Sequence, residues 1–228
     1  MTQVPTLTSS DNGGEFGTSV AVSGNPIVAG AVNTSNMTET ATLAASDGQT
    51  GGAFGDSVSI SGNTIAAGAY FATDSSGNGF AGKAYVFVRL PSGWSRDITS
   101  TAELTPSDSE LLNCRGVSIV TNAHTIVPAT DGHNNFPGAA DIFSKPSVGW
   151  ANMTQKAELA ASDGGNRQDF GFSAPISGDT AVIGSPNGYY SRGAAYVFGE
   201  PASGWTNMTQ TTELTAPQGQ RAKGFDSP

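Results

Sequence analysis

Hydrophobic and polar residues alternate in short blocks along this chain, most clearly over residues 54–61. There Val58 and Ile60 alternate with three serines, and a period of two predicts a half-buried β-strand. Gly62-Asn63 predicts a tight turn, because both residue types tolerate a positive φ. Residues 64–69, mostly small and apolar, predict the second strand of a hairpin.

Two more strands complete this unit. Residues 82–88 contain Tyr85, Val86 and Phe87, aromatic and β-branched types that are favoured in strands. After the turn at residues 91–94, residues 99–104 predict a fourth strand. Four antiparallel strands per unit is the content of a propeller blade.

The pattern repeats along the chain. A Leu-x-x-Ser-Asp segment, complete in four copies and partial in a fifth, begins at Leu7, Leu43, Leu104, Leu159 and Leu214, at intervals of 36, 61, 55 and 55 residues. It divides a single domain, residues 1–228, into approximate units at 7–42, 43–103, 104–158 and 159–213, with a partial unit at 214–228. A period near 55 with strand-like content indicates a propeller or a repeat array.

The units are not equally complete. Residues 170–205 copy the second unit almost position by position, whereas the third unit has Arg115-Gly116 near the expected Phe-Gly and a one-residue length change before Thr125-Ile126. If the two best units are equivalent, their matching strand positions should be buried. These positions are Val58, Ile60, Ile65, Tyr85, Phe87, Ile176, Val182, Tyr196 and Phe198.

Both terminal units look unfinished. The first has strand candidates at residues 19–22, 27–31 and 40–43, but a deletion after Ala31 removes a whole strand. The last stops soon after a Phe-Gly-like start at Phe225. Open blades expose strand edges and apolar faces, so we expect them to contact missing sequence or another copy, or to combine into one blade that closes a small ring.

Two segments carry a family signature. Phe54-Gly55 followed by Gly68-Ala69, and Phe170-Gly171 followed by Gly184-Ser185-Pro186, resemble the FG-GAP repeat. This repeat builds the propeller heads of integrin alpha chains and many bacterial surface proteins, and the bacterial form is the closer likeness. The resemblance implies an all-β fold, a β-propeller of four-stranded blades with about four blades present, either partial or small. It also implies an extracellular or cell-surface location and a role in adhesion or ligand binding.

Composition narrows the classes of partner. The formal net charge is −9 and only 10 residues are Lys or Arg, which argues against nucleic acid. No apolar run approaches the roughly 20 residues of a membrane span. Cys114 is the single cysteine, so no intrachain disulfide can form. Residues 1–5 lack the features of a signal peptide, so we expect either that the chain was cut from a longer precursor or that it is not exported through that route.

The resemblance also implies candidate calcium loops after the Gly-Ala-Pro signature. No loop supplies three carboxylates, which favours plain turns over calcium; no cofactor is assigned, and calcium stays the alternative. The loop residues in question are Asp74, Ser75, Ser76 and Asn78; Asp131, Asn134 and Asn135; and Asn187 and Ser191.

Other recurring residues have a structural and a functional interpretation. Asp11, Asp47, Asp108 and Asp163 fit turn caps better than a binding face. Trp94, Trp150 and Trp205 fit anchors of the outer hairpins better than stacking platforms for sugars. Three Asn-Met-Thr segments, beginning at Asn36, Asn152 and Asn207, match the N-glycosylation pattern, but shared ancestry of the units explains their spacing.

Signals for catalysis are few. His124 and His133 are the two histidines, and both fit surface turns, so no catalytic, cofactor-binding or metal-binding residue is assigned. The leading hypothesis is a non-enzymatic binding or adhesion module for a protein or glycan. The alternatives are a structural propeller fragment that self-associates through its incomplete terminal blades, and the non-catalytic domain of a larger extracellular hydrolase.

Overall fold

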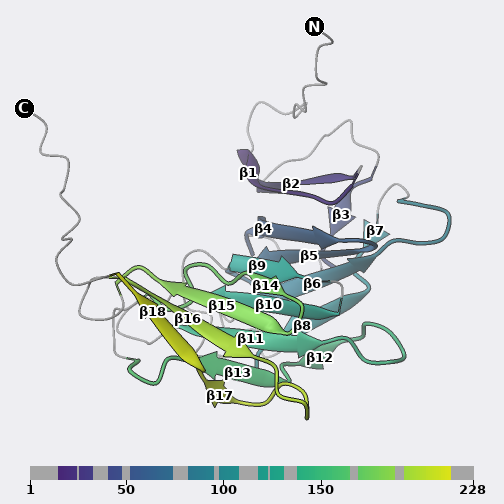
Figure 1. The fold of residues 1–228 in the computed structure, drawn as a ribbon. Coiled ribbons are helices and arrows are strands. Elements are labelled where there is room, and N and C mark those ends of the chain that lie inside the picture. The colour runs from purple at the N-terminus through teal and green to yellow at the C-terminus, as the bar shows by residue number, and fades with distance from the viewer. Residues whose placement is uncertain are drawn as a thin grey trace, which may run out of the picture.

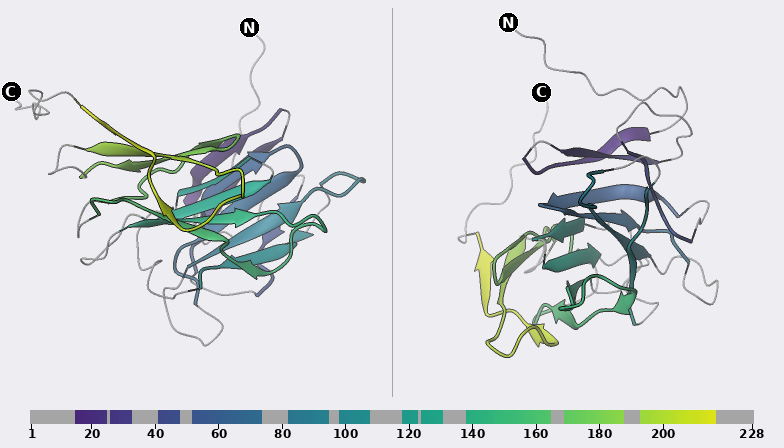
Figure 2. Two further views of the ribbon diagram at one scale, coloured as in Figure 1. Left: turned by 60° about the horizontal axis from the view of Figure 1, so that its bottom comes forward. Right: turned by 90° about the vertical axis from the view of Figure 1, so that its right-hand side faces the viewer.

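The computed structural model describes residues 15–24, 26–32, 41–47, 52–73, 82–94, 98–107, 118–122, 124–130, 138–164, 169–187 and 193–216. All regular secondary structure in these ranges is β-strand, arranged in small sheets that follow one another in chain order (Figures 1 and 2). The chain is therefore an all-β partial propeller, which confirms the predicted fold class.

Three sheets contain the predicted meander of four antiparallel strands, which we call blades 2, 3 and 4. Blade 2 consists of β4 (Phe54–Ser61), β5 (Thr64–Ala69), β6 (Lys83–Val88) and β8 (Ala102–Thr105). Blade 3 consists of β9 (Ser118–Thr121), β10 (Thr125–Thr130), β11 (Ala139–Ser144) and β13 (Ala157–Ala160). Blade 4 consists of β14 (Ile176–Ser177), β15 (Thr180–Ser185), β16 (Ala194–Gly199) and β18 (Thr212–Thr215).

Blade 1 is smaller in the described part of the chain. Its hairpin pairs β1 (Glu15–Val22) with β2 (Ile27–Val32). The next described strand, β3 (Leu43–Ala44), occupies the repeat position of β8, the outer strand of blade 2. Residues 41 and 42 are the described part of the connection, and neither is in a strand.

Short strands join each blade to the one before it. β7 (Ile98–Thr99), β12 (Met153–Thr154) and β17 (Met208–Thr209) pair in parallel with the outer strands β3, β8 and β13 of the preceding blades. The prediction of one strand over residues 99–104 was therefore wrong. The chain crosses between blades there: the Ser100 amide donates to the Ala44 carbonyl (3.2 Å), whereas the Thr101 amide donates to the Val86 carbonyl (2.6 Å).

The predicted length change in the third unit is also wrong. Thr121 pairs with Ile126 as Ile60 pairs with Ile65, so the two hairpins have the same length. His124 lies in the turn, as expected. The Asn122 side-chain oxygen accepts hydrogen bonds from the His124 and Thr125 amides (3.1 and 2.8 Å), which stabilises the turn without the Gly-Asn pair of blade 2.

The apolar core lies between blades. We call the face of a blade toward the preceding blade its front face, and the opposite face its back face. The back face of blade 2, with Ala66, Ala84, Val86, Ala102 and Leu104, packs on the front face of blade 3, with Ile119, Ile126, Phe143 and Trp150. The back face of blade 3 packs on blade 4 in the same way, and Ala21 and Val28 of blade 1 pack on the front face of blade 2.

Burial of the predicted positions largely follows this scheme. Ile60, Ile65, Tyr85, Phe87, Tyr196 and Phe198 are buried, as predicted, while Val58, Ile176 and Val182 are only partly buried. Val182 lies on the back face of blade 4, where no described blade follows. Its partial exposure is thus a consequence of its place in the stack.

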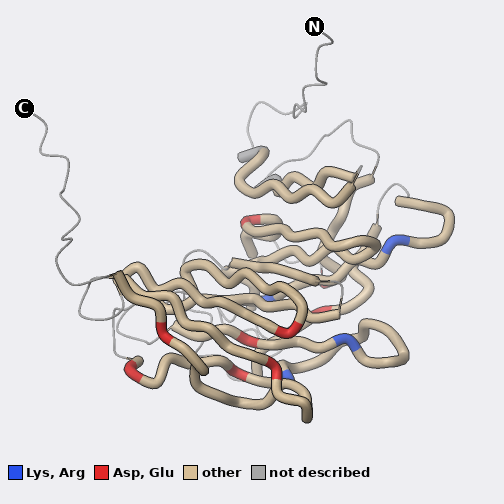
Figure 3. The backbone as a smooth tube through the Cα atoms, viewed as in Figure 1, with Lys and Arg blue, Asp and Glu red and all other residues tan. Residues whose placement is uncertain are grey.

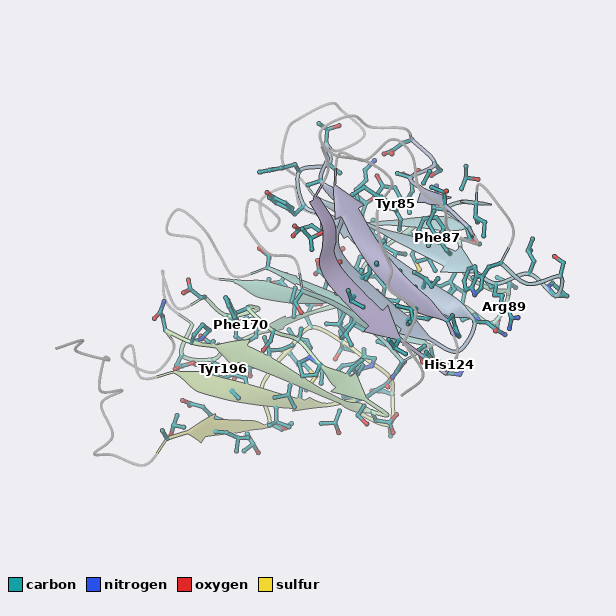
Figure 4. All side chains as sticks on the ribbon, turned by 90° about the horizontal axis from the view of Figure 1, so that it is seen from above. Tyr85, Phe87, Arg89, His124, Phe170 and Tyr196 are labelled. Atoms are coloured by element: carbon teal, nitrogen blue, oxygen red, sulfur yellow. The ribbon has the colours of Figure 1, made fainter. Side chains whose placement is uncertain are left out.

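The Phe-Gly signature has a physical cause. In blade 4 the Phe170 ring packs edge-on against Tyr196, with a centroid distance of 5.4 Å (Figure 4). It also packs edge-on against Phe198, with a centroid distance of 6.1 Å. Gly171 has a φ of +102°, and a Cβ there would lie 2.3 Å from the Thr130 carbonyl oxygen. The glycine therefore allows the backbone of one blade to approach the next while the ring fills the front face.

Candidate functional site

The recurring aspartates lie at the junctions between blades. Asp47 follows the outer strand β3, and the Tyr85 hydroxyl on β6 of the next blade donates to both of its carboxylate oxygens (3.0 and 2.9 Å). In blade 4 the Tyr196 hydroxyl lies 3.2 Å from Asp163 Oδ2. These aspartates therefore bridge blades, a role that neither the turn-cap nor the binding-face interpretation anticipated. Asp11 and Asp108 lie outside the described residues.

Blade 2 adds a cation to this junction. Lys83 Nζ lies 2.7 Å from Asp47 Oδ2 and 3.6 Å from Glu103 Oε2, and the lysine side chain is 7% exposed. Blade 4 has Ala194 at the repeat position of Lys83. The junction between blades 1 and 2 is therefore an ion-pair network, whereas the junction between blades 3 and 4 depends on a phenol-carboxylate hydrogen bond. Elsewhere the described charged residues are scattered along the blades (Figure 3).

The electrostatics of both junctions keep the phenols protonated. Burial, then the hydrogen bond to Asp47, raise the pKa of Tyr85 well above its ordinary value of about 10. Burial and then Asp163 raise the pKa of Tyr196 in the same direction. Both groups therefore act as hydrogen-bond donors near neutral pH and are unsuited to proton transfer there.

Blade 3 has different residues at this position. Asp141 replaces the tyrosine, is 3% exposed, and pairs in register with Glu158 on β13. The repeat positions of Phe54 and Asp47 are occupied by Arg115 and Asp108, which lie outside the described residues. The ring contact of Phe54 with Tyr85 in blade 2, and of Phe170 with Tyr196 in blade 4, is therefore not a requirement of the blade backbone.

The tryptophans are structural, as the favoured interpretation held. Trp150 and Trp205 are buried within the clusters between blades, and Trp94 is partly buried against the cluster on the front face of blade 2. An indole that stacks on a sugar must expose a ring face. The buried indoles of Trp150 and Trp205 therefore do not provide sugar platforms.

The Asn-Met-Thr segments contain contacts that the sequence analysis missed. The Asn152 side-chain oxygen accepts from the Glu103 amide (2.9 Å), and Asn207 accepts from Glu158 (3.0 Å). The glutamine that follows each of these two segments binds a serine of the preceding blade: Gln155 to Ser107, and Gln210 to Ser162. The regular spacing of 55 residues between Asn152 and Asn207 was the signal for this role. Asn36 lies outside the described residues.

The other chemistry-bearing candidates do not converge on a site in the described part of the chain. His124 is exposed in its hairpin turn, and His133, Cys114 and most candidate calcium residues fall outside the described ranges. Asn187 is described and donates to Asp169. No group of three metal-ligating His, Cys, Asp or Glu side chains occurs among the described residues.

One end of the blades exposes aromatic residues. We call this end the loop rim; it is where β5, β10 and β15, the second strands of blades 2, 3 and 4, finish. Phe71 follows β5 and Phe172 follows the Phe-Gly of blade 4, and they are 40% and 62% exposed. Backbone hydrogen bonds fix both: the Phe71 amide donates to Gly52 (3.1 Å) and the Phe172 amide to Asp169 (3.2 Å). The rim therefore presents apolar rings on ordered turns.

Comparison with known families identifies the repeat. The family model of the FG-GAP repeat matches residues 37–87 and 153–198. Each matched stretch includes an outer strand of one blade and then the first three strands of the next, from β3 into β6 and from β12 into β16. Among curated proteins, none matches the chain. FG-GAP repeats are typical of integrin-like propellers for binding or adhesion, are generally non-catalytic, and are common in extracellular proteins.

Proposed function

This chain is an FG-GAP repeat protein, and on that premise we propose that it is a non-enzymatic binding module outside the cell or on its surface. The loop rim would contact a protein or glycan ligand. The supporting observation is the pair of exposed, hydrogen-bonded aromatic turns at Phe71 and Phe172. Ordered aromatic side chains lose little entropy on binding and are enriched at the centres of interfaces.

The rest of the molecule is consistent with a scaffold. The aromatic residues of the Gly-Trp turns and of the front faces pack between blades, so they hold the loops in place. The two phenols beside carboxylates have raised pKa values and do not supply an acid or base near neutral pH. No helix in the described residues is long and apolar enough to cross a membrane.

The experiment is a binding screen with a matched control. Labelled chain is applied to a glycan array and to a panel of immobilised extracellular proteins, with the double variant Phe71→Ser, Phe172→Ser beside it. The control is Val148→Ser, because Val148 is 92% exposed but lies in a turn at the opposite end of blade 3. We expect the double variant to weaken binding at least about tenfold and the control to leave it unchanged.

Two results would contradict the proposal. One is an equal loss of binding in the double variant and in the control. The other is the absence of any bound ligand in both panels together with turnover of ester or glycoside substrates by the same preparation, which would indicate an enzyme.

A further inference from the structure

Equivalent apolar residues of the repeat are buried within the stack and exposed at its first blade. Val20, Val22 and Ile27 of blade 1 occupy the positions of Val58, Ile60 and Ile65 in blade 2. Ile60 and Ile65 are 8% and 3% exposed, whereas Val20, Val22 and Ile27 are 59%, 61% and 52% exposed. The front face of blade 1 is thus an apolar blade face that no other described blade covers.

The last blade has the complementary face uncovered. Leu104 and Leu159, on the back faces of blades 2 and 3, are at most 1% exposed, whereas the equivalent Leu214 of blade 4 is 53% exposed. Val182 and Val197 on the same face are only partly buried. The edge of blade 4 is open as well: β8 and β13 receive β12 and β17, but among the described strands β18 pairs only with β16.

The stack itself shows what covers such faces. The front faces of blades 2, 3 and 4 are each covered by the back face of the preceding blade, as the three core clusters record. Back faces supply small residues such as Ala66 and Ala84, and front faces supply larger side chains. Hydrogen bonds then set the register, from Ser19 Oγ to the Gly55 carbonyl (2.9 Å) and from the Thr121 amide to Ser59 Oγ (3.1 Å).

We propose that the front face of blade 1 binds the back face of blade 4 of a second copy of this chain, head to tail. The contact continues the stacking already present within one copy and removes both apolar faces from water. Such a heterologous contact uses two different surfaces, so it closes into a ring when the rotation allows. Two copies would place eight units in one ring, within the range of closed propellers.

The test is the solution mass of residues 1–228 by sedimentation velocity, over about two decades of concentration. We expect a species of twice the 23.1 kDa chain mass that dissociates on dilution. Val22→Asp blocks the front face and Leu214→Asp blocks the back face. Both positions are more than half exposed, so neither substitution removes buried packing, and circular dichroism checks that each variant folds.

The head-to-tail contact predicts how these two variants behave alone and when mixed. Each alone should be a monomer, but their equimolar mixture should form a 1:1 complex, because one supplies an intact back face and the other an intact front face. Val148→Asp, exposed and away from both faces, should associate like the parent chain. Either of two results would overturn the proposal: a parent chain that stays monomeric at every concentration, or a Leu214→Asp variant that still associates alone.

Discussion

Blades 3 and 4 have the same strands in the same order but different surroundings. Blade 3 has a neighbour on both faces, and Ile142 and Leu159 on its back face are fully buried. Blade 4 has a described neighbour only on its front face, and the equivalents Val197 and Leu214 are partly buried and exposed. Stability in such a stack depends on contacts between nearest neighbours. A residue's contribution is therefore set by its place in the stack more than by its place in the repeat.

Truncating the same leucine in the two blades should have very different effects. Leu159→Ala should lower the free energy of unfolding by about 2–5 kcal/mol, because it leaves a cavity in a buried cluster. Leu214→Ala should cost less than about 1 kcal/mol, because the side chain is half in water already. Urea unfolding measures both, at a protein concentration where the chain is monomeric. Equal costs would show that the back face of blade 4 is covered in solution.

Removing the junction carboxylate should distinguish blade 2 from blade 4. Asp47→Asn takes the nearest anion from the buried Lys83, and we expect a loss of about 2 kcal/mol, below the full cost of breaking a buried pair because Asp47 is partly exposed. Asp163→Asn weakens a hydrogen bond from Tyr196 and should cost about 1 kcal/mol. Chemical denaturation at neutral pH measures the two losses in unfolding free energy. A loss for Asp163→Asn as large as that for Asp47→Asn would mean that the ion pair of Asp47 with Lys83 contributes nothing to stability.

High pH should weaken both junctions. Because the pKa values of Tyr85 and Tyr196 are raised in the folded state, their contribution is complete below the unfolded value of about 10 and is lost as the pH rises above it. As the pH rises above that value, each phenol should make the free energy of unfolding fall by up to about 1.4 kcal/mol more per pH unit. The free energy of unfolding, measured between about pH 9 and pH 11, should therefore fall less steeply with pH for Tyr85→Phe than for the parent chain. An unchanged slope in both Tyr→Phe variants would contradict the raised pKa values.

Removing calcium should have the smallest effect. None of the candidate loops of the three larger blades contains three carboxylates, and calcium sites need six to eight oxygen ligands. We therefore expect no shift in Tm when a chelator is added. A fall of more than about 10 °C would show tight binding to the native state, and would mean that the loops stabilise the stack in addition to its interfaces.

Local pattern was sufficient for much of this structure. The alternation around Val58 and Ile60 predicted β4, the Gly62-Asn63 turn predicted its hairpin with β5, and the recurrence of both in residues 170–185 predicted an equivalent blade. The family signature followed from the same segments. These features depend on neighbours within a few residues, so the sequence alone determines them.

Contacts between blades could not be predicted in this way. The sequence displays Asp47, Tyr85 and Asn152 as recurring residues, but their partners are 38 to 49 positions away, and periodicity carries no information about such pairs. Residues 99–104 were expected to form one strand because nothing local marks the crossing at Ser100. Likewise, Leu159 and Leu214 occupy the same position of the repeat. The tertiary structure places a blade against Leu159, whereas no described blade lies against Leu214, and this alone decides which leucine is removed from water.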